Sequence, residues 1–61
     1  MTRDDLAKRL RATAEVMNAA AGSLHFYGGV SANAMQHAAE LAGAATMVAE
    51  WADELEKEQG E

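Results

Sequence analysis

The amino-acid sequence predicts an all-α protein, an antiparallel helical hairpin of two long helices that assembles into a homo-oligomeric helix bundle. Apolar residues recur at intervals of three and four along two long stretches, which is the spacing of amphipathic helices. Between these stretches lies Gly28-Gly29, and glycines adopt the backbone angles that end a helix and turn the chain. The chain contains no Pro, which favours uninterrupted helices.

The first helix is expected over about residues 3–24, followed by a turn over about 25–30. Thr2 can cap its start, with Asp5 at the third helical position. One stripe of this helix comprises Leu6, Leu10, Thr13, Met17, Ala20 and Leu24, and is widened by Ala7, Ala14 and Ala21.

The second helix is expected over about residues 32–58, with Ser31 as its N-cap. Its bulky seam comprises Val30, Ala34, His37, Leu41, Ala44, Val48, Trp51 and Leu55. A second stripe beside this seam is almost entirely alanine and comprises Ala38, Ala42, Ala45, Ala49 and Ala52.

These two stripes make the apolar surface wider than one partner helix covers. A chain of 61 residues without Cys is small enough to need oligomerisation for stability. The alanine stripe would let a further helix approach closely, either in a dimeric four-helix bundle or in a ring of hairpins. We expect the core and oligomer seam to comprise Leu6, Leu10, Met17, Leu24, Leu41, Val48, Trp51, Leu55, Ala38, Ala42, Ala45 and Ala49.

The charges are divided unevenly between the two halves. Residues 1–30 hold four basic and three acidic side chains, a net +1, whereas residues 31–61 hold one basic and seven acidic side chains, a net −6. Basic residues at a helix start and acidic residues at a helix end both oppose the helix dipole. Antiparallel pairing places these ends side by side, where they attract each other, so the pattern supports a hairpin.

The composition argues against several partners. The net charge is −5 and no basic face is visible, so direct binding of DNA or RNA is not expected. Residues 16–39 lack Asp, Glu, Lys and Arg but include polar side chains and the glycine pair, so we expect no membrane span. The first residues lack the pattern of a signal peptide, and we expect a cytoplasmic protein.

The tip of the hairpin is the candidate ligand site. Aromatic side chains there could stack on a base, while backbone N–H groups at the start of the second helix could hold a phosphate. An arginine from a neighbouring subunit could assist. The candidate residues are His25, Phe26, Tyr27, Gly28, Gly29, Ser31, Asn33, Arg9 and Arg11. Alternatively, the aromatics plug the end of the bundle and the arginines pair with the acidic end of the second helix.

Other candidate sites have simpler explanations. His37 and Glu40 form a His-x-x-Glu pair like those of di-iron bundles, but a structural His is the favoured interpretation. Met47 falls on the polar face of the second helix, where it could mark a contact with a partner. No spacing suggests a nucleophile and base, so we expect no catalysis, cofactor or metal.

Three blocks carry a family resemblance: residues 10–15, 37–41 and 51–55. These blocks resemble a sequence pattern of short bacteriophage accessory proteins, Leu-Arg-Ala-Ala-Asp/Glu-x-Leu. In this chain they read Leu-Arg-Ala-Thr-Ala-Glu, His-Ala-Ala-Glu-Leu and Trp-Ala-Asp-Glu-Leu. The resemblance implies a small anti-defence protein in the host cytoplasm, either an inhibitor that coats a host defence protein or an oligomeric sponge for a cyclic nucleotide signal. It transfers no binding residues.

Together these patterns predict a non-catalytic, homo-oligomeric helical binding protein. Its partners would be further copies of itself and either a host defence protein or an anionic nucleotide. One alternative is a structural assembly adaptor without a ligand. The other is an acidic inhibitor that mimics nucleic-acid charge through the second helix, whose exposed face includes Glu50 and Glu54.

Overall fold

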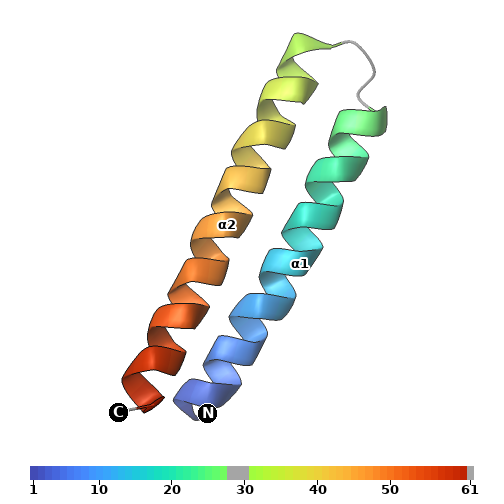
Figure 1. Cartoon of the computed structure of the whole chain (residues 1–61). Helices are drawn as coiled ribbons and strands as arrows, with labels where there is room; N and C mark the ends of the chain where they lie inside the picture. Colours follow the sequence, from blue (N-terminus) through green and yellow to red (C-terminus); the bar gives the residue numbers. More distant parts are fainter. Residues whose placement is uncertain (28–30, 61) are drawn as a thin grey trace.

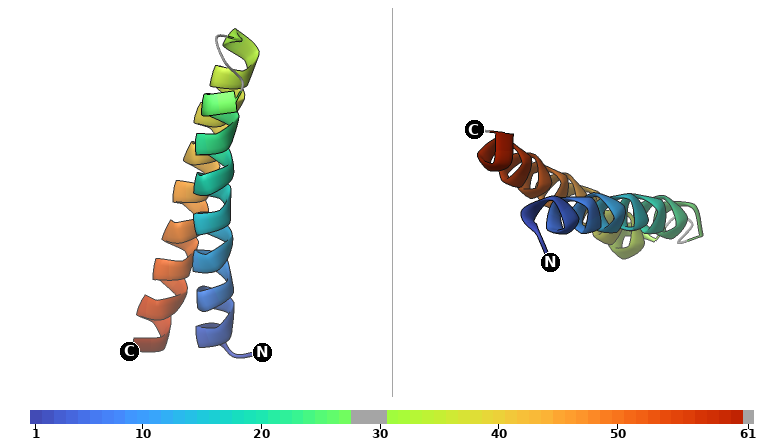
Figure 2. Two further views of the ribbon diagram at one scale, coloured as in Figure 1. Left: turned by 90° about the vertical axis from the view of Figure 1, so that its right-hand side faces the viewer. Right: turned by 90° about the horizontal axis from the view of Figure 1, so that it is seen from below.

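The computed structural model describes residues 1–27 and 31–60, with side chains as far as Glu58. Two helices, α1 (Arg3–Tyr27) and α2 (Ala32–Gly60), run antiparallel, so that both termini lie at one end, the open end, and the connection lies at the other, the tip (Figure 1). The helices form a single layer and are inclined to each other (Figure 2). The Cα trace measures 47 × 14 × 12 Å. The all-α antiparallel hairpin predicted from the sequence is therefore confirmed.

Both helix starts have the predicted caps. The Asp5 N–H donates to Thr2 Oγ1 over 3.1 Å, and the Thr2 N–H donates to Asp5 Oδ2 over 3.3 Å. This reciprocal pair is a capping box, which satisfies backbone donors that the first helical turn leaves unpaired. At α2 the Ala34 N–H donates to Ser31 Oγ over 3.4 Å, so Ser31 is the N-cap of that helix.

The end of α1 differs from the sequence prediction. The helix continues through His25, Phe26 and Tyr27, which were expected in the turn. Gly22 lies inside the helix without ending it. One glycine costs only about 1 kcal/mol relative to alanine, and because no proline follows, each residue keeps the backbone N–H that the helix requires. At the other end, α2 extends slightly further than expected, to Gly60.

The seam between the two helices is made of alanine. The buried residues are spaced seven apart on each helix and comprise Ala7, Ala14 and Ala21 of α1 and Ala38, Ala45 and Ala52 of α2. A repeat of seven keeps residues on one helical face, and the opposite helix is the only element that can cover them. No large side chain is fully buried among the described residues.

This arrangement corrects the expected use of the alanine stripe. The stripe was expected to receive another subunit, but within the hairpin Ala38, Ala45 and Ala52 are already buried, and its other two members, Ala42 and Ala49, are half-buried. A methyl side chain lets two helix axes approach closely, so the hairpin closes on its smallest residues. The bulky residues are left at the edge of the seam.

The seam divides the surface of the hairpin into two sides. In an α-helix, positions three residues after a buried alanine turn to one side of it and positions four residues after turn to the other. Because the helices are antiparallel, the positions three residues after a buried alanine lie on one side of the hairpin in both helices, and the positions four residues after lie on the other. On one side lie Leu10, Met17, Leu24, Leu41, Val48 and Leu55, together with Leu6 and Trp51, which directly precede buried alanines.

We call these eight residues the bulky face. Five of them are half-buried, whereas Leu6, Leu24 and Trp51 are exposed. Trp51 was expected in the core, but 48% of it is exposed, so the hairpin itself does not bury it. The physical reason is its position at the outer margin of the bulky face, beyond the reach of the opposite helix.

The opposite side carries ion pairs toward the open end. Arg11 Nε donates to Glu56 Oε1 over 2.8 Å, and its Nη2 donates to Asp53. The Glu56 and Asp53 carboxylates raise the pKa of the Arg11 guanidinium further above its ordinary value. Arg3 also pairs with Glu58, over 3.4 Å. The predicted attraction between the basic start of α1 and the acidic end of α2 is confirmed.

The helices show no membrane-spanning character. Neither helix, over the residues described, has a stretch long and apolar enough to cross a bilayer.

Candidate binding surfaces

Two aromatic side chains stand out at the end of α1. The rings of Phe26 and Tyr27 pack edge to face, with centroids 5.1 Å apart and planes inclined by 75°. They are nonetheless 76% and 83% exposed. Within the single hairpin, therefore, they are not packed against α2. Most of the surface of both rings is accessible to a ligand.

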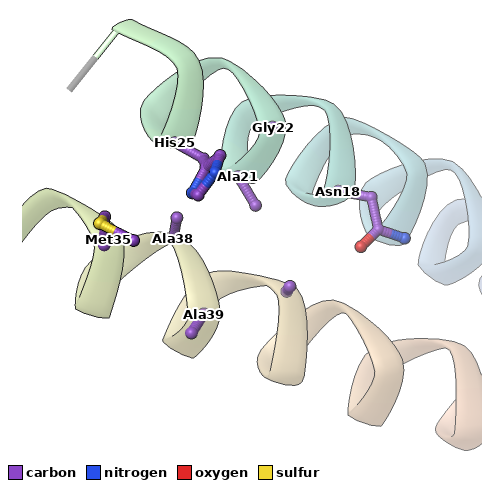
Figure 3. A pocket seen from close by; sticks show the side chains of 8 residues that line it. Asn18, Ala21, Gly22, His25, Met35, Ala38 and Ala39 are labelled. Atoms are coloured by element: carbon purple, nitrogen blue, oxygen red, sulfur yellow. The ribbon is translucent and has the colours of Figure 1, made fainter. Parts of the chain in front are cut away.

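A groove lies between the helices near this end. Its volume is about 490 Å³, and it is lined by Asn18, Ala21, Gly22 and His25 of α1 and by Met35, Ala38, Ala39 and Ala42 of α2. Figure 3 shows His25 and Asn18 reaching from α1 toward α2. The lining is otherwise apolar, so the groove has an apolar floor with two polar side chains on one wall.

Small residues create this groove. A Cβ added at Gly22 would meet nothing within 4 Å, and the facing residues Ala39 and Ala42 have only methyl groups. The groove opens on the side opposite the bulky face, because Asn18, His25 and Ala42 each lie four residues after a buried alanine. His25 was predicted to belong to the ligand site, but the groove itself was not predicted from the sequence. The signal was the accumulation of small residues on one side of both helices.

The remaining candidate ligand residues are not gathered in a single chain. Ser31 serves as a cap, and Asn33 is exposed on the first turn of α2. Gly28 and Gly29 lie outside the described residues. Arg11 lies fourteen residues before His25 on the same helix, which corresponds to about 21 Å, and Arg9 lies further still. Within one chain, the arginines and the tip therefore form separate surfaces.

The acidic residues of α2 are partly neutralised. Asp53 and Glu56 bind Arg11, and Glu58 binds Arg3. Glu50 and Glu54 are exposed on α2. The charge that could imitate a nucleic acid is thus smaller than the sequence count suggests.

His37 and Glu40 form a surface pair. His37 Nδ1 lies 2.9 Å from Glu40 Oε1, and both side chains are well exposed. His37 is therefore exposed rather than buried in the hairpin. Among the described residues no three His, Asp or Glu side chains gather into a metal-binding group.

Large apolar side chains are also exposed outside the bulky face, and besides Phe26 and Tyr27 they include Met1, Val16, Met35 and Met47. Val16 of α1 is 69% exposed and Met47 of α2 is 52% exposed. Each lies two residues after a buried alanine, at the outer flank of its helix next to the bulky face. Met47 was predicted from the sequence as a candidate contact with a partner, whereas Val16 was not. The two residues extend the apolar surface beyond the eight members of the bulky face.

Comparison of the chain with protein-family models, with curated proteins and with solved structures found no match.

Proposed function

We propose that this protein is a non-catalytic helical binding protein that acts as a homo-oligomer, and that the bulky face is its self-association surface. One observation carries the proposal: among the residues whose side chains the structure describes, every buried one is an alanine. Leucine, valine and tryptophan side chains of both helices are left on one side without an element to cover them.

The energetics support a second copy. Complete burial of a Leu or Val side chain contributes roughly 1.5–3 kcal/mol, so the bulky face holds much of the stabilisation available to this chain. An alanine seam supplies far less apolar burial per residue. Single domains of about this size are marginal even with larger cores. Pairing of two hairpins would convert the bulky face into the core of a four-helix bundle.

Charge substitutions in the bulky face test this proposal. Leu41→Asp or Val48→Asp should convert an oligomer into a monomer in size-exclusion chromatography with light scattering, because a buried unpaired carboxylate is strongly unfavourable. Ala12→Asp, at an exposed position of α1, is the matched control and should leave the oligomer intact. An unchanged oligomer in both bulky-face variants would contradict the proposal.

The exposed aromatic pair supports a second element of the proposal, a ligand site at the tip. Phe26 and Tyr27 offer ring faces for stacking on a nucleobase, and the chain between residues 17 and 39 carries no Asp, Glu, Lys or Arg to repel or capture a ligand by charge. A sponge for a cyclic nucleotide, as the resemblance to phage accessory proteins implies, would use this surface.

Calorimetric titration with a panel of cyclic mononucleotides and dinucleotides tests the tip. Tyr27→Ala should abolish binding while leaving the oligomer intact, and Ser23→Ala, at an exposed position one turn earlier, should bind normally. Equal binding by Tyr27→Ala and the native protein would exclude the tip. Absence of any nucleotide binding would favour an assembly adaptor or a protein inhibitor, for which Glu50→Lys with Glu54→Lys should weaken capture of the partner.

A further inference from the structure

We infer that two hairpins pair through their bulky faces with both tips at the same end, so that α1 of each copy lies beside α2 of the other. This inference rests on the self-association proposed above and specifies its geometry. It is carried by the residues that flank the bulky face on each helix.

Two symmetric arrangements are available to a pair of hairpins that share one face. A two-fold axis parallel to the helices keeps the tips together and places α1 beside the partner's helix α2. A two-fold axis across the helices puts the tips at opposite ends and places α1 beside the second α1, and α2 beside the second α2. The flanking residues distinguish these arrangements, because each brings different flanks together.

The flanking residues lie two positions after each buried alanine. From the open end to the tip, α1 presents Arg9, Val16 and Ser23. In the same direction, α2 presents Glu54, Met47 and Glu40. With the tips together, these two rows lie side by side. A cation then faces an anion, an apolar side chain faces another, and a hydroxyl faces a carboxylate, in the pairs Arg9–Glu54, Val16–Met47 and Ser23–Glu40.

The heights of these residues agree with the pairing. Rotation about an axis parallel to the helices keeps every residue at its own height along the bundle. Within one chain Arg11 reaches Asp53. Arg9 lies two residues before Arg11 and Glu54 one residue after Asp53, so Arg9 of one copy and Glu54 of the other stand within a turn of the same level.

The same arrangement accounts for two of the exposed apolar residues outside the bulky face, Val16 and Met47. Val16 and Met47 are 69% and 52% exposed in the single hairpin. With the tips together, each would contact the other across the margin of the interface, twice per dimer. The bulky face and its flanks would then form one continuous apolar surface that the second copy covers.

The opposite arrangement leaves the charges without partners. It would set the acidic half of α2 against the tip half of the second α2, where residues 32–39 include no Lys or Arg. It would also set Arg9 against the second α1 near Ser23, in a stretch without carboxylates. Opposite charges across an interface fix orientation and register, and here they favour the tips-together dimer.

A stable pair would have to cover about a fifth of the surface of each chain. A standard interface removes roughly 800 Å² of surface from each partner, which is about a fifth of the 4471 Å² of this chain. The bulky face runs along most of a hairpin 47 Å long. A tips-together dimer also brings two Phe26–Tyr27 pairs to one end of the bundle, so that a ligand site there would be double.

Spin-label distances test the orientation. The chain has no Cys, so Gln36→Cys near the tip and Lys57→Cys near the open end, both exposed, can each carry a single label. With the tips together, the two labels lie at equal height and are separated only by the width of the bundle. In the opposite arrangement each pair would be further separated by about 30 Å along the axis.

Short distances at both positions would support the inference, and long distances at both would overturn it while leaving self-association intact. No intermolecular distance at either position, with a folded chain, would overturn self-association as well. The two failures are therefore distinguishable.

A charge exchange provides a second test. In a tips-together homodimer, Arg9→Glu would set two carboxylates against each other at both contacts, and Glu54→Arg would set two guanidinium groups against each other. Each variant alone should therefore dimerise poorly. A mixture of the two should form heterodimers in several-fold excess over either homodimer by native mass spectrometry. A control mixture of Arg9→Glu with Glu15→Arg should show no such preference, because the exposed Glu15 follows buried Ala14 by one residue and lies on the side opposite the bulky face. The same ratio of heterodimer to homodimer in both mixtures would contradict the inference.

Discussion

Arg11 of α1 and Glu56 of α2 are joined by a 2.8 Å hydrogen bond across 45 positions of sequence. With Asp53 as a second acceptor, the guanidinium binds two carboxylates of the opposite helix. The pair lies on the side of the hairpin opposite the bulky face. It therefore stabilises the register of the hairpin without occupying the surface proposed for self-association.

Replacement of Arg11 should reveal this role through its dependence on salt. Arg11→Lys keeps the charge but loses the planar group that reaches both carboxylates, so the melting temperature should fall modestly at low ionic strength. The difference from the native protein should shrink in high salt, because exposed ion pairs are screened. Lys8→Ala, which removes only a pair with Asp4 on the same helix, should cause a smaller change. A deficit unaffected by salt would indicate a packing role.

Enlargement of the alanine seam should destabilise the hairpin. Ala45 is completely buried, and Ala45→Leu would force the helices apart at a cost of about 1–3 kcal/mol. Urea unfolding at fixed protein concentration measures this change. Ala19→Leu, at an exposed position of α1, is the control and should be close to neutral. Equal stability of the two variants would mean that the seam tolerates bulk and is not closely packed.

Loss of the first cap should fray α1. Thr2→Ala removes the acceptor of the Asp5 N–H and should cost about 0.5–2 kcal/mol, with faster hydrogen exchange confined to the first turn. Thr46→Ala is a suitable control, since the Thr46 hydroxyl only donates to the Ala42 carbonyl within the helix. If the first turn exchanged equally fast in both variants, the capping box would have no stabilising role.

Trp51 is the only tryptophan and reports directly on the bulky face. Because it is about half exposed in the hairpin, its covering by a second copy should shift its fluorescence to shorter wavelength. Dilution through the concentration range in which the oligomer dissociates should reverse this shift. The helical circular dichroism should change at lower concentrations than the fluorescence, or by a smaller fraction. An emission maximum independent of concentration, across the range in which the mass changes, would place Trp51 outside the interface.

The sequence predicted the hairpin because its signals are local. Intervals of three and four residues define helices, Thr2 and Ser31 define their starts, and the distribution of charge defines their antiparallel order. The end of α1 was placed too early because the whole stretch of about 25–30 was assigned to the turn around Gly28-Gly29, although nothing in His25, Phe26 or Tyr27 prevents a helix. The helix continues until Tyr27.

The choice between two apolar stripes was not available from the sequence. Ala45 and Val48 lie three residues apart, and either stripe could face the other helix of the same chain. Which one does so depends on how closely two helices can approach and on what covers the remaining side. The groove beside Gly22 likewise arises only when small residues of both helices are brought together.

Native mass spectrometry of the protein as purified from cells tests the central claim most directly, because it reports the subunit count and any bound mass in one spectrum. The claim that the bulky face is a self-association surface predicts a homo-oligomer, with the dimer as its smallest form, and a discrete adduct of nucleotide mass would further support a ligand at the tip. A folded monomer at high protein concentration, with its bulky face uncovered, would contradict the claim.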